Sequence, residues 1–209
     1  MPEDVAGPFE KIPSDIMEQA KLQSLGYQST EEELGERFHI NPKVLSALNP
    51  AKDLAKAGEQ IQVPNVQRES LMPAARVVVS KSQGTVSAFA YDGTLLAQYP
   101  ATMGSEHDPL PIGEWKITGV QRNPAFYYNP SLFWDAKPED SKARIAPGPN
   151  NPVGLVWIGL SKEHYGIHGT PEPGRIGHTE SHGCIRLTNW DAEELSKLVE
   201  PGVPAILQE

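Results

Sequence analysis

Residues 165–187, with the sequence YGIHGTPEPGRIGHTESHGCIRL, carry most of the reactive side chains of this chain. Four of the six histidines lie at positions 164, 168, 178 and 182, and the single cysteine, Cys184, follows them. Residues 166–169 are strand-like, and the proline- and glycine-rich residues 169–181 can return the chain alongside that strand. The stretch therefore predicts that His168 and His182 lie near Cys184.

A lone cysteine beside histidines is a nucleophile, a metal ligand or a buried packing residue, because it cannot form an internal disulfide. A free thiol has a pKa near about 8.5 and needs an imidazole base to react at neutral pH. His182 shares a face with Cys184 if the segment is extended, since the two lie two residues apart. Gly183 lets a carbonyl group approach the backbone amides of Gly183 and Cys184, which could form an oxyanion hole.

The zinc interpretation rests on two pairs with close spacing, His164 with His168 and His182 with Cys184. In a strand the first pair would be about 13 Å apart, at about 3.3 Å per residue, which does not suit one metal ion. The third interpretation, a packed group of hydrogen-bonded histidines and a cysteine, does not account for the flanking glycines. The pattern favours a nucleophilic cysteine, with no metal or cofactor expected.

The amino-acid composition excludes several fold classes and classes of partner. The chain has 209 residues, 20 prolines and 18 glycines, which argues against long helices and for strands joined by stiff loops. The apolar runs are too short to span a membrane. The net charge is −9 and the chain has no basic block, so nucleic-acid binding is disfavoured.

Residues 1–28 form a lead segment, and its first residues carry no export signal. The pattern in residues 29–66 predicts two helices followed by a strand. Thr30 and Glu33 form the pattern of a capping box for the first helix, and Asn41-Pro42 begins the second. The strand is expected at residues 61–63. These residues resemble the later part of a LysM module, a small glycan-binding fold. The usual opening strand of that module is absent, so the alternative is a packing role.

Residues 75–208 predict a mainly β domain. Strands are expected at residues 77–80, 85–90, 95–99, 113–118, 156–160, 166–169 and 202–207. One helix is expected at 191–199, capped by Asn189 or Asp191. The proline-rich residues 121–153 read as an irregular loop, which forms either a lid or a satellite core with its aromatic side chains.

The motifs His168-Gly169-Thr170 and Ser181-His182-Gly183-Cys184-Ile185-Arg186, a dozen residues apart, resemble the signature of the L,D-transpeptidases, whose catalytic domain is named YkuD. Residues 103–104, 109–115, 147–154 and 189–192 match further parts of the family pattern. The resemblance implies a YkuD-type β-sandwich or barrel-like domain with one or two helices, preceded here by the small LysM-like unit.

The resemblance also implies residue roles. Cys184 would attack the stem-peptide carbonyl before the terminal D-Ala, with His168 as base. The Gly169 carbonyl would hold the imidazole tautomer, and His182 and Gly183 would help to form the oxyanion pocket. Arg186 would bind a substrate carboxylate, and Ser181 and Thr170 are further substrate-binding residues, with loop hydrogen bonding and a surface ion pair as the structural alternatives.

The implied partner is peptidoglycan, with a wall-anchored lipoprotein as a possible acceptor and carbapenem β-lactams as inhibitors. The implied location is the periplasm or cell wall, with the export signal trimmed. Transfer to an amine would give a cross-link, whereas transfer to water would give L,D-carboxypeptidase activity. The alternative from another class is a catalytically silent peptidoglycan-binding protein.

Overall fold

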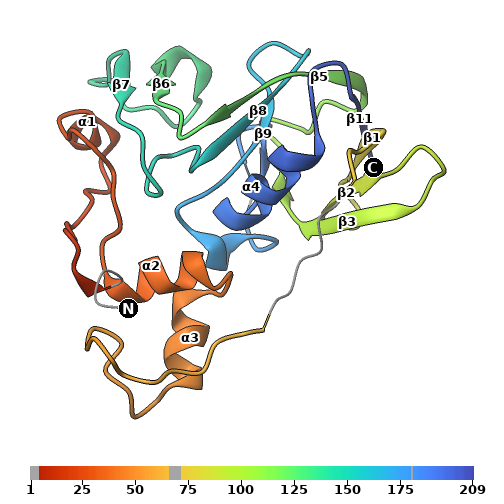
Figure 1. Cartoon of the computed structure of the whole chain (residues 1–209). Helices are drawn as coiled ribbons and strands as arrows, with labels where there is room; N and C mark the ends of the chain where they lie inside the picture. Colours follow the sequence, from red (N-terminus) through yellow and green to blue (C-terminus); the bar gives the residue numbers. More distant parts are fainter. Residues whose placement is uncertain (1–4, 66–71, 180) are drawn as a thin grey trace.

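The computed structural model describes residues 5–65, 72–179 and 181–209 (Figure 1). In this part of the chain a nine-stranded sheet forms the main body. Its strands lie in the order β3 (Leu95–Pro100), β2 (Thr85–Phe89), β1 (Arg76–Ser80), β11 (Pro204–Gln208), β5 (Gly113–Arg122), β8 (Val156–Leu160), β9 (Gly166–His168), β10 (Ile185–Arg186) and β4 (Thr102–Met103).

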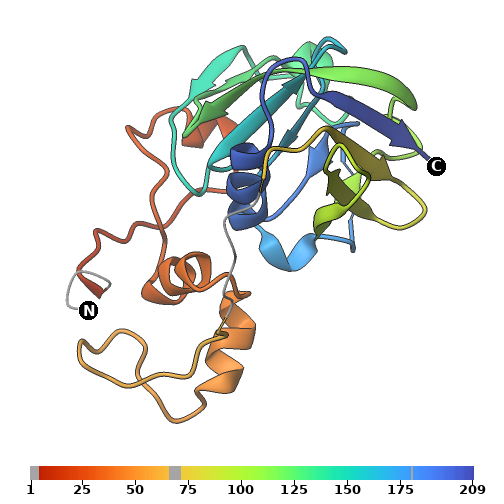
Figure 2. The ribbon, with the colours of Figure 1, turned by 45° about the vertical axis from the view of Figure 1, so that its right-hand side comes forward.

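The sheet is mixed and strongly curled. β1 pairs with β11 in parallel and β9 with β10 in parallel, while the other neighbours are antiparallel. The two edge strands, β3 and β4, are separated in sequence only by Ala101, whose N–H donates to the Gly84 carbonyl at 2.8 Å. Edges joined by one residue require the sheet to bend back on itself, which gives the barrel-like body visible in Figures 1 and 2.

Helix α4 (Asn189–Leu198) lies under the curved sheet and packs against β8 and β9 (Figure 2). Leu195 and Leu198 bury its apolar face in the main core. The helix is the one expected at 191–199, but its N-cap is Thr188, which accepts from the Asp191 N–H at 3.2 Å. The cap prediction was wrong because Asn189 faces inward and binds other groups, described below.

The predicted strands are confirmed in the main sheet, and the predicted irregular loop contains structure of its own. Within residues 121–153, β6 (Phe126–Tyr128) and β7 (Ala143–Ile145) form a separate two-stranded sheet, and Pro130–Leu132 forms a 3-10 turn. The inner face of this hairpin packs against α1 (Ile16–Gln19) and Leu25 of the lead segment. The hairpin was not predicted from the sequence, because its strands have three residues each, too few to show the alternation typical of a strand.

Helices α2 (Thr30–Arg37) and α3 (Pro42–Leu48) confirm the two helices predicted in residues 29–66. The N-cap of α2 is Ser29, which accepts from the Glu32 N–H, while the Glu32 carboxylate accepts from the Gln28 N–H at 2.7 Å. The capping pair is thus shifted by one residue from the predicted Thr30 and Glu33. Asn41 caps α3, with Pro42 in its first turn, as expected.

The strand predicted at residues 61–63 is not formed, and that prediction was wrong. The segment returns beside α3, held by Asn49, whose side chain binds the backbone N–H and carbonyl of Gln62. A strand needs a partner, and the segment that precedes α2 is engaged elsewhere: the Leu25 N–H donates to the Pro147 carbonyl, and the Leu25 carbonyl accepts from Asn150. Glycan binding by residues 29–66 stays a prediction.

None of the helices in the described ranges is both long and apolar enough to cross a lipid bilayer.

Candidate active site

Two of the predicted reactive residues, His168 and Cys184, lie on neighbouring segments where β9 runs beside β10. The parallel ladder pairs Ile167 with Ile185 and His168 with Arg186, and Cys184 directly precedes β10. Because side chains alternate along a strand, the two isoleucines enter the core while His168 and Arg186 share the opposite face. Burial also alternates through residues 181–187, which puts the half-buried Cys184 on the face of Arg186.

His168 is held in one orientation. Its Nδ1 lies 2.7 Å from the Gly169 carbonyl, and its ring stacks on Trp157 with 5.5 Å between centroids. A carbonyl oxygen can only accept, so Nδ1 carries the hydrogen in this contact. The neutral ring therefore presents its unprotonated Nε2 as the acceptor, the atom that a general base needs.

Burial governs the charge of this ring. His168 is 4% exposed, and the pKa of its imidazole is lowered to about 3, chiefly by desolvation. The Arg186 guanidinium contributes to the lowering, while the hydrogen bond to Gly169 acts in the opposite direction. The imidazole is accordingly neutral at physiological pH and able to take a proton.

The thiol of Cys184 lies against backbone groups of the strand beside it. Its Sγ is 3.6 Å from the His164 carbonyl, toward which the S–H donates. Burial raises the pKa of the Cys184 thiol, while the Gly166 N–H and the Arg186 guanidinium act in the opposite direction. The resting pair is a neutral thiol and a neutral imidazole.

Ser181 fixes the backbone of the segment that leads to the cysteine. Its buried hydroxyl accepts from the Gly104 N–H at 2.7 Å and donates to the Cys184 carbonyl at 2.6 Å, and the Ser181 N–H donates to the Gly104 carbonyl. Gly183 adopts a φ of +86°, and a Cβ at this position would lie 2.6 Å from the Tyr165 ring. The motif thus needs a glycine here both for its backbone conformation and for space.

The remaining predicted residues differ in their surroundings. Thr170 is buried, and its hydroxyl accepts from the Glu172 N–H at 3.3 Å. Arg186 is half-buried, and desolvation lowers the pKa of its guanidinium. His164 and His178 have exposed side chains, whereas His168 is buried, so the four histidines that cluster in the sequence do not share one environment. Among the described residues, histidines, cysteine and carboxylates do not form a group of three that could hold a metal ion.

His182 is attached to residues 129–142, the segment that joins β6 to β7. Its Nε2 lies 2.9 Å from Asp135 Oδ1, and the rings of Phe133 and Trp134 lie 5.1 and 5.7 Å from the imidazole centroid. The same segment is tied to the lead segment, because Lys137 forms an ion pair with Asp15. Residues 129–142 therefore cover the cysteine motif on one side.

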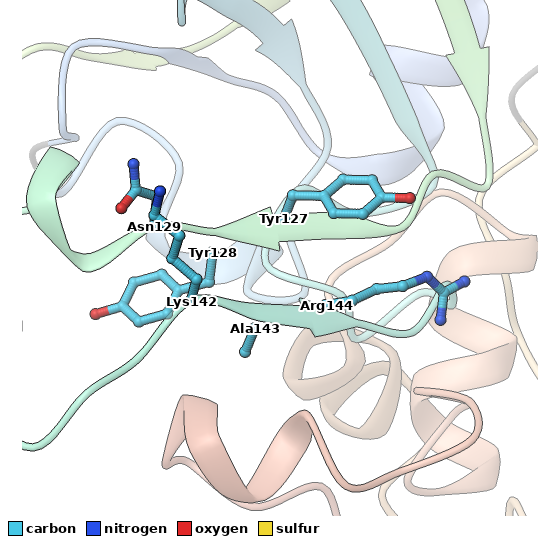
Figure 3. A pocket seen from close by; sticks show the side chains of 6 residues that line it. All are labelled: Tyr127, Tyr128, Asn129, Lys142, Ala143 and Arg144. Carbon is cyan, nitrogen blue, oxygen red and sulfur yellow. The ribbon is translucent and has the colours of Figure 1, made fainter.

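A shallow hollow of about 280 Å³ lies on the hairpin itself (Figure 3). Tyr127 and Arg144 are cross-strand partners on its outer face, and Lys142 and Asn129 lie at its other end. Tyr128 instead turns inward, where its hydroxyl donates to Asp140 at 2.7 Å. Cys184 is not among the residues that line this hollow.

Sequence reasoning missed three side chains around the site. Trp157 occupies an ordinary strand position and contacts His168, and Asp135 lies in a loop without a motif and contacts His182. Glu36, which accepts from Asn189 at 2.9 Å, belongs to a helix more than 130 residues before His168. The one signal in the sequence was the group of aromatic residues near Phe133, which predicted either a lid or a satellite core. Phe133 packs in a small hydrophobic cluster with Tyr128 and Ile145, and the hydrogen bond between Asp135 and His182 had no signal in the sequence.

Comparison with a family model and with known proteins gives the same family in each case. Residues 74–207 match the YkuD family model, described as the L,D-transpeptidase catalytic domain. The "Putative L,D-transpeptidase YkuD" of Bacillus licheniformis is 31% identical over 175 residues, 83% of this chain and 90% of that protein. The protein of the same name from Bacillus subtilis is 31% identical over 166 residues, 79% of this chain and 85% of its own length.

A solved structure has the same fold. The L,D-transpeptidase 3 from Mycobacterium tuberculosis, in complex with a faropenem-derived adduct, superposes with a TM-score of 0.53 at 25% identity. The match covers 66% of this chain and 61% of the mycobacterial chain, so this chain spans about three fifths of that solved protein.

Proposed function

This chain belongs to the YkuD family of L,D-transpeptidase catalytic domains, and from that premise we propose that it is a cysteine-dependent L,D-transpeptidase of peptidoglycan stem tetrapeptides. The observation that carries the proposal is the arrangement of β9 and β10. It combines a histidine whose Nδ1 is bound by a carbonyl with a cysteine on the neighbouring segment.

The proposed reaction has two acyl transfers. Cys184 Sγ attacks the carbonyl carbon before the terminal D-Ala while the thiol proton passes to His168 Nε2. The tetrahedral intermediate expels the D-Ala amine, which takes the proton from the imidazolium and leaves a thioester. An amine of a second stem peptide then attacks the thioester, His168 removes its proton, and Cys184 leaves as the thiol.

Because the thiol pKa is raised and the imidazole pKa is lowered, proton transfer accompanies attack instead of preceding it. The backbone amides of Gly183 and Cys184 are proposed to bind the oxyanion, with His182 at the edge of that pocket. The positive charge of Arg186 on the same face as His168 supports a role in binding a substrate carboxylate. Such a substrate places the enzyme in the periplasm or cell wall.

Intact-mass measurement after incubation with faropenem or a carbapenem tests the nucleophile. A faropenem-derived adduct in a member of the same fold supports the choice of probe. We expect one covalent adduct on the wild-type protein and none on Cys184→Ala. An unmodified wild-type mass, or equal adducts on both proteins, contradicts the proposal.

A stem tetrapeptide assay separates transfer from hydrolysis. With an acceptor amine present, we expect release of D-Ala together with a cross-linked product, and loss of both in His168→Ala. Release of D-Ala without the cross-linked product would identify an L,D-carboxypeptidase, and a protein that binds peptidoglycan without either reaction would be catalytically silent.

A further inference from the structure

The side chain of Asn189, the first residue of α4, lies fully buried between the N-terminal helices and the catalytic histidine. Its Oδ1 accepts from the Leu155 N–H at 3.1 Å. Its Nδ2 donates to Glu36 Oε1 at 2.9 Å and to the Pro149 carbonyl at 3.1 Å. Both amide hydrogens and the oxygen are thus engaged, which fixes the orientation of this amide.

The same amide packs directly on the backbone of Gly169. A Cβ built on Gly169 would lie 2.2 Å from Asn189 Oδ1, and one built on Gly154 would lie 1.9 Å from it. The two glycines therefore let the amide touch the main chain on both sides. Because the Gly169 carbonyl binds His168 Nδ1 at 2.7 Å, a rotation of Asn189 would move the group that orients the imidazole.

Glu36 is the contribution of α2 to this arrangement. It is half-buried beside a cavity of about 320 Å³, which is also lined by Tyr27, Glu33, Arg37, His39, Leu155 and Glu193. Desolvation, with Glu32, Glu193 and Asp191 nearby, raises the pKa of the Glu36 carboxyl to about 8. The neutral acid keeps a carbonyl oxygen that can accept from Asn189.

We propose that Glu36 is a positioning residue for the catalytic base: it holds Asn189, and Asn189 holds Gly169 and the imidazole of His168. The N-terminal unit thereby sets the orientation of the histidine, beyond any role in binding the wall. This inference rests on the proposed function for its kinetic readout, whereas its spectroscopic readout does not need turnover.

The alternative is that Glu36 only docks α2 on the catalytic domain. A docking role predicts a loss of thermal stability with an unchanged histidine. A positioning role predicts that the environment of His168 changes when the acceptor at position 36 is removed and returns to that of wild type when an acceptor is present. Glu36→Gln keeps an acceptor oxygen and removes the acid, whereas Glu36→Ala removes both. Glu31→Ala, on the same helix, is the matched control.

The experiment measures the His168 Nδ1–H resonance of the full chain by ¹⁵N-edited NMR, together with kcat and KM for D-Ala release. In Glu36→Ala we expect that resonance to shift or broaden and kcat to fall about tenfold, with KM within about twofold of wild type; tenfold corresponds to about 1.4 kcal/mol, the size of one hydrogen bond. Glu36→Gln and Glu31→Ala are expected to match wild type in both readouts.

If Glu36→Ala does not fold, Glu36→Met replaces it, since methionine fills the volume without an acceptor. An unchanged resonance in a folded Glu36→Ala or Glu36→Met protein overturns the inference. Failure of the wild-type protein to release D-Ala would instead overturn the proposed function, while the resonance would still decide whether Glu36 orients His168.

Discussion

His182 Nε2 and Asp135 Oδ1, 47 residues apart in sequence, lie 2.9 Å from each other and join the cysteine motif to the segment between β6 and β7. The bond is partly exposed to solvent, since the Asp135 side chain is 49% accessible. A hydrogen bond in such a partly exposed place contributes about 0.5–1.5 kcal/mol. The covering segment is therefore held at its tip by a contact that substitution can remove without disturbing the core.

Asp135→Ala is expected to lower kcat/KM for a stem tetrapeptide by about three- to tenfold, because His182 and the flanking rings lose their anchor. Steady-state D-Ala release measures the effect. Glu139→Ala is the matched control, an exposed acid in the same segment. Equal kcat/KM values for the two variants would show that the bond to His182 does not affect catalysis.

Alkylation of Cys184 by iodoacetamide is expected to be slow at neutral pH and to rise about tenfold per pH unit between pH 6 and 8. The reason is the raised pKa of the thiol, below which the reactive thiolate fraction increases tenfold per unit. Intact-mass kinetics at a series of pH values measure it. A rate that has already reached a plateau at pH 6 would indicate a thiolate–imidazolium pair in the resting protein.

The ring of His168 is expected to stay neutral down to about pH 4, which a pH titration of its NMR resonances measures. Its folded-state pKa of about 3 lies below the ordinary 6.5, so the unfolded chain takes up a proton first as the pH falls. Stability from this group is present above pH 6.5 and is lost between pH 6.5 and 3. A ring that titrates near 6.5 would mean that the imidazole is solvated.

The contribution of Glu36 to stability changes with pH in the opposite direction to that of His168. Its folded-state pKa of about 8 lies above the ordinary 4.5, so between these pH values the unfolded chain releases a proton that the folded chain keeps. The stability of the folded protein therefore falls as the pH rises from 4.5 to 8. Glu36→Gln is expected to raise Tm at pH 8.5, by about 2–4 °C for each kcal/mol gained, and to change it little at pH 4.5. Thermal melts of this variant and of Glu31→Gln, at both pH values, provide the comparison. An equal response of the two variants would contradict the assignment.

Ser181→Ala is expected to destabilise the protein by about 1–3 kcal/mol, because it leaves the Gly104 N–H and the Cys184 carbonyl without their buried partner. Urea unfolding measures the change. Ser131→Ala removes an exposed hydroxyl that donates to Asn129, and is expected to shift stability by less than about 0.5 kcal/mol. A Ser181→Ala protein as stable as wild type would indicate that another group replaces the hydroxyl.

Local patterns predicted the parts of the fold that depend on local physics. The β-branched run at residues 77–79, the alternating polarity of residues 113–118 and the Asn41-Pro42 start of α3 are properties of a few adjacent residues, and the structure agrees with them. The strand at 61–63 failed because pairing depends on a distant partner, and Leu25 pairs with the 147–150 loop instead.

In the candidate site, too, the residues that belong to a local motif were predicted and those placed by long-range contacts were not. His168 and Cys184 belong to a compact motif and were identified from it, although their chemical roles stay a proposal. Asp135 and Glu36 act through bonds to His182 and Asn189 that span 47 and 153 positions. A single sequence has no periodicity or spacing that reports such contacts.

The pairing of Leu25 with the loop at residues 147–150 has a practical consequence for anyone who shortens this protein. The family match begins at residue 74, but the packing of the domain includes earlier residues, since Gly148 lies so close to Leu25 that an added Cβ would be 2.1 Å from the Leu25 carbonyl oxygen. A fragment that starts at residue 72 would expose this surface together with the inner face of the β6–β7 hairpin. We therefore expect that a stable fragment for expression, crystallisation and inhibitor screening has to begin ahead of α1.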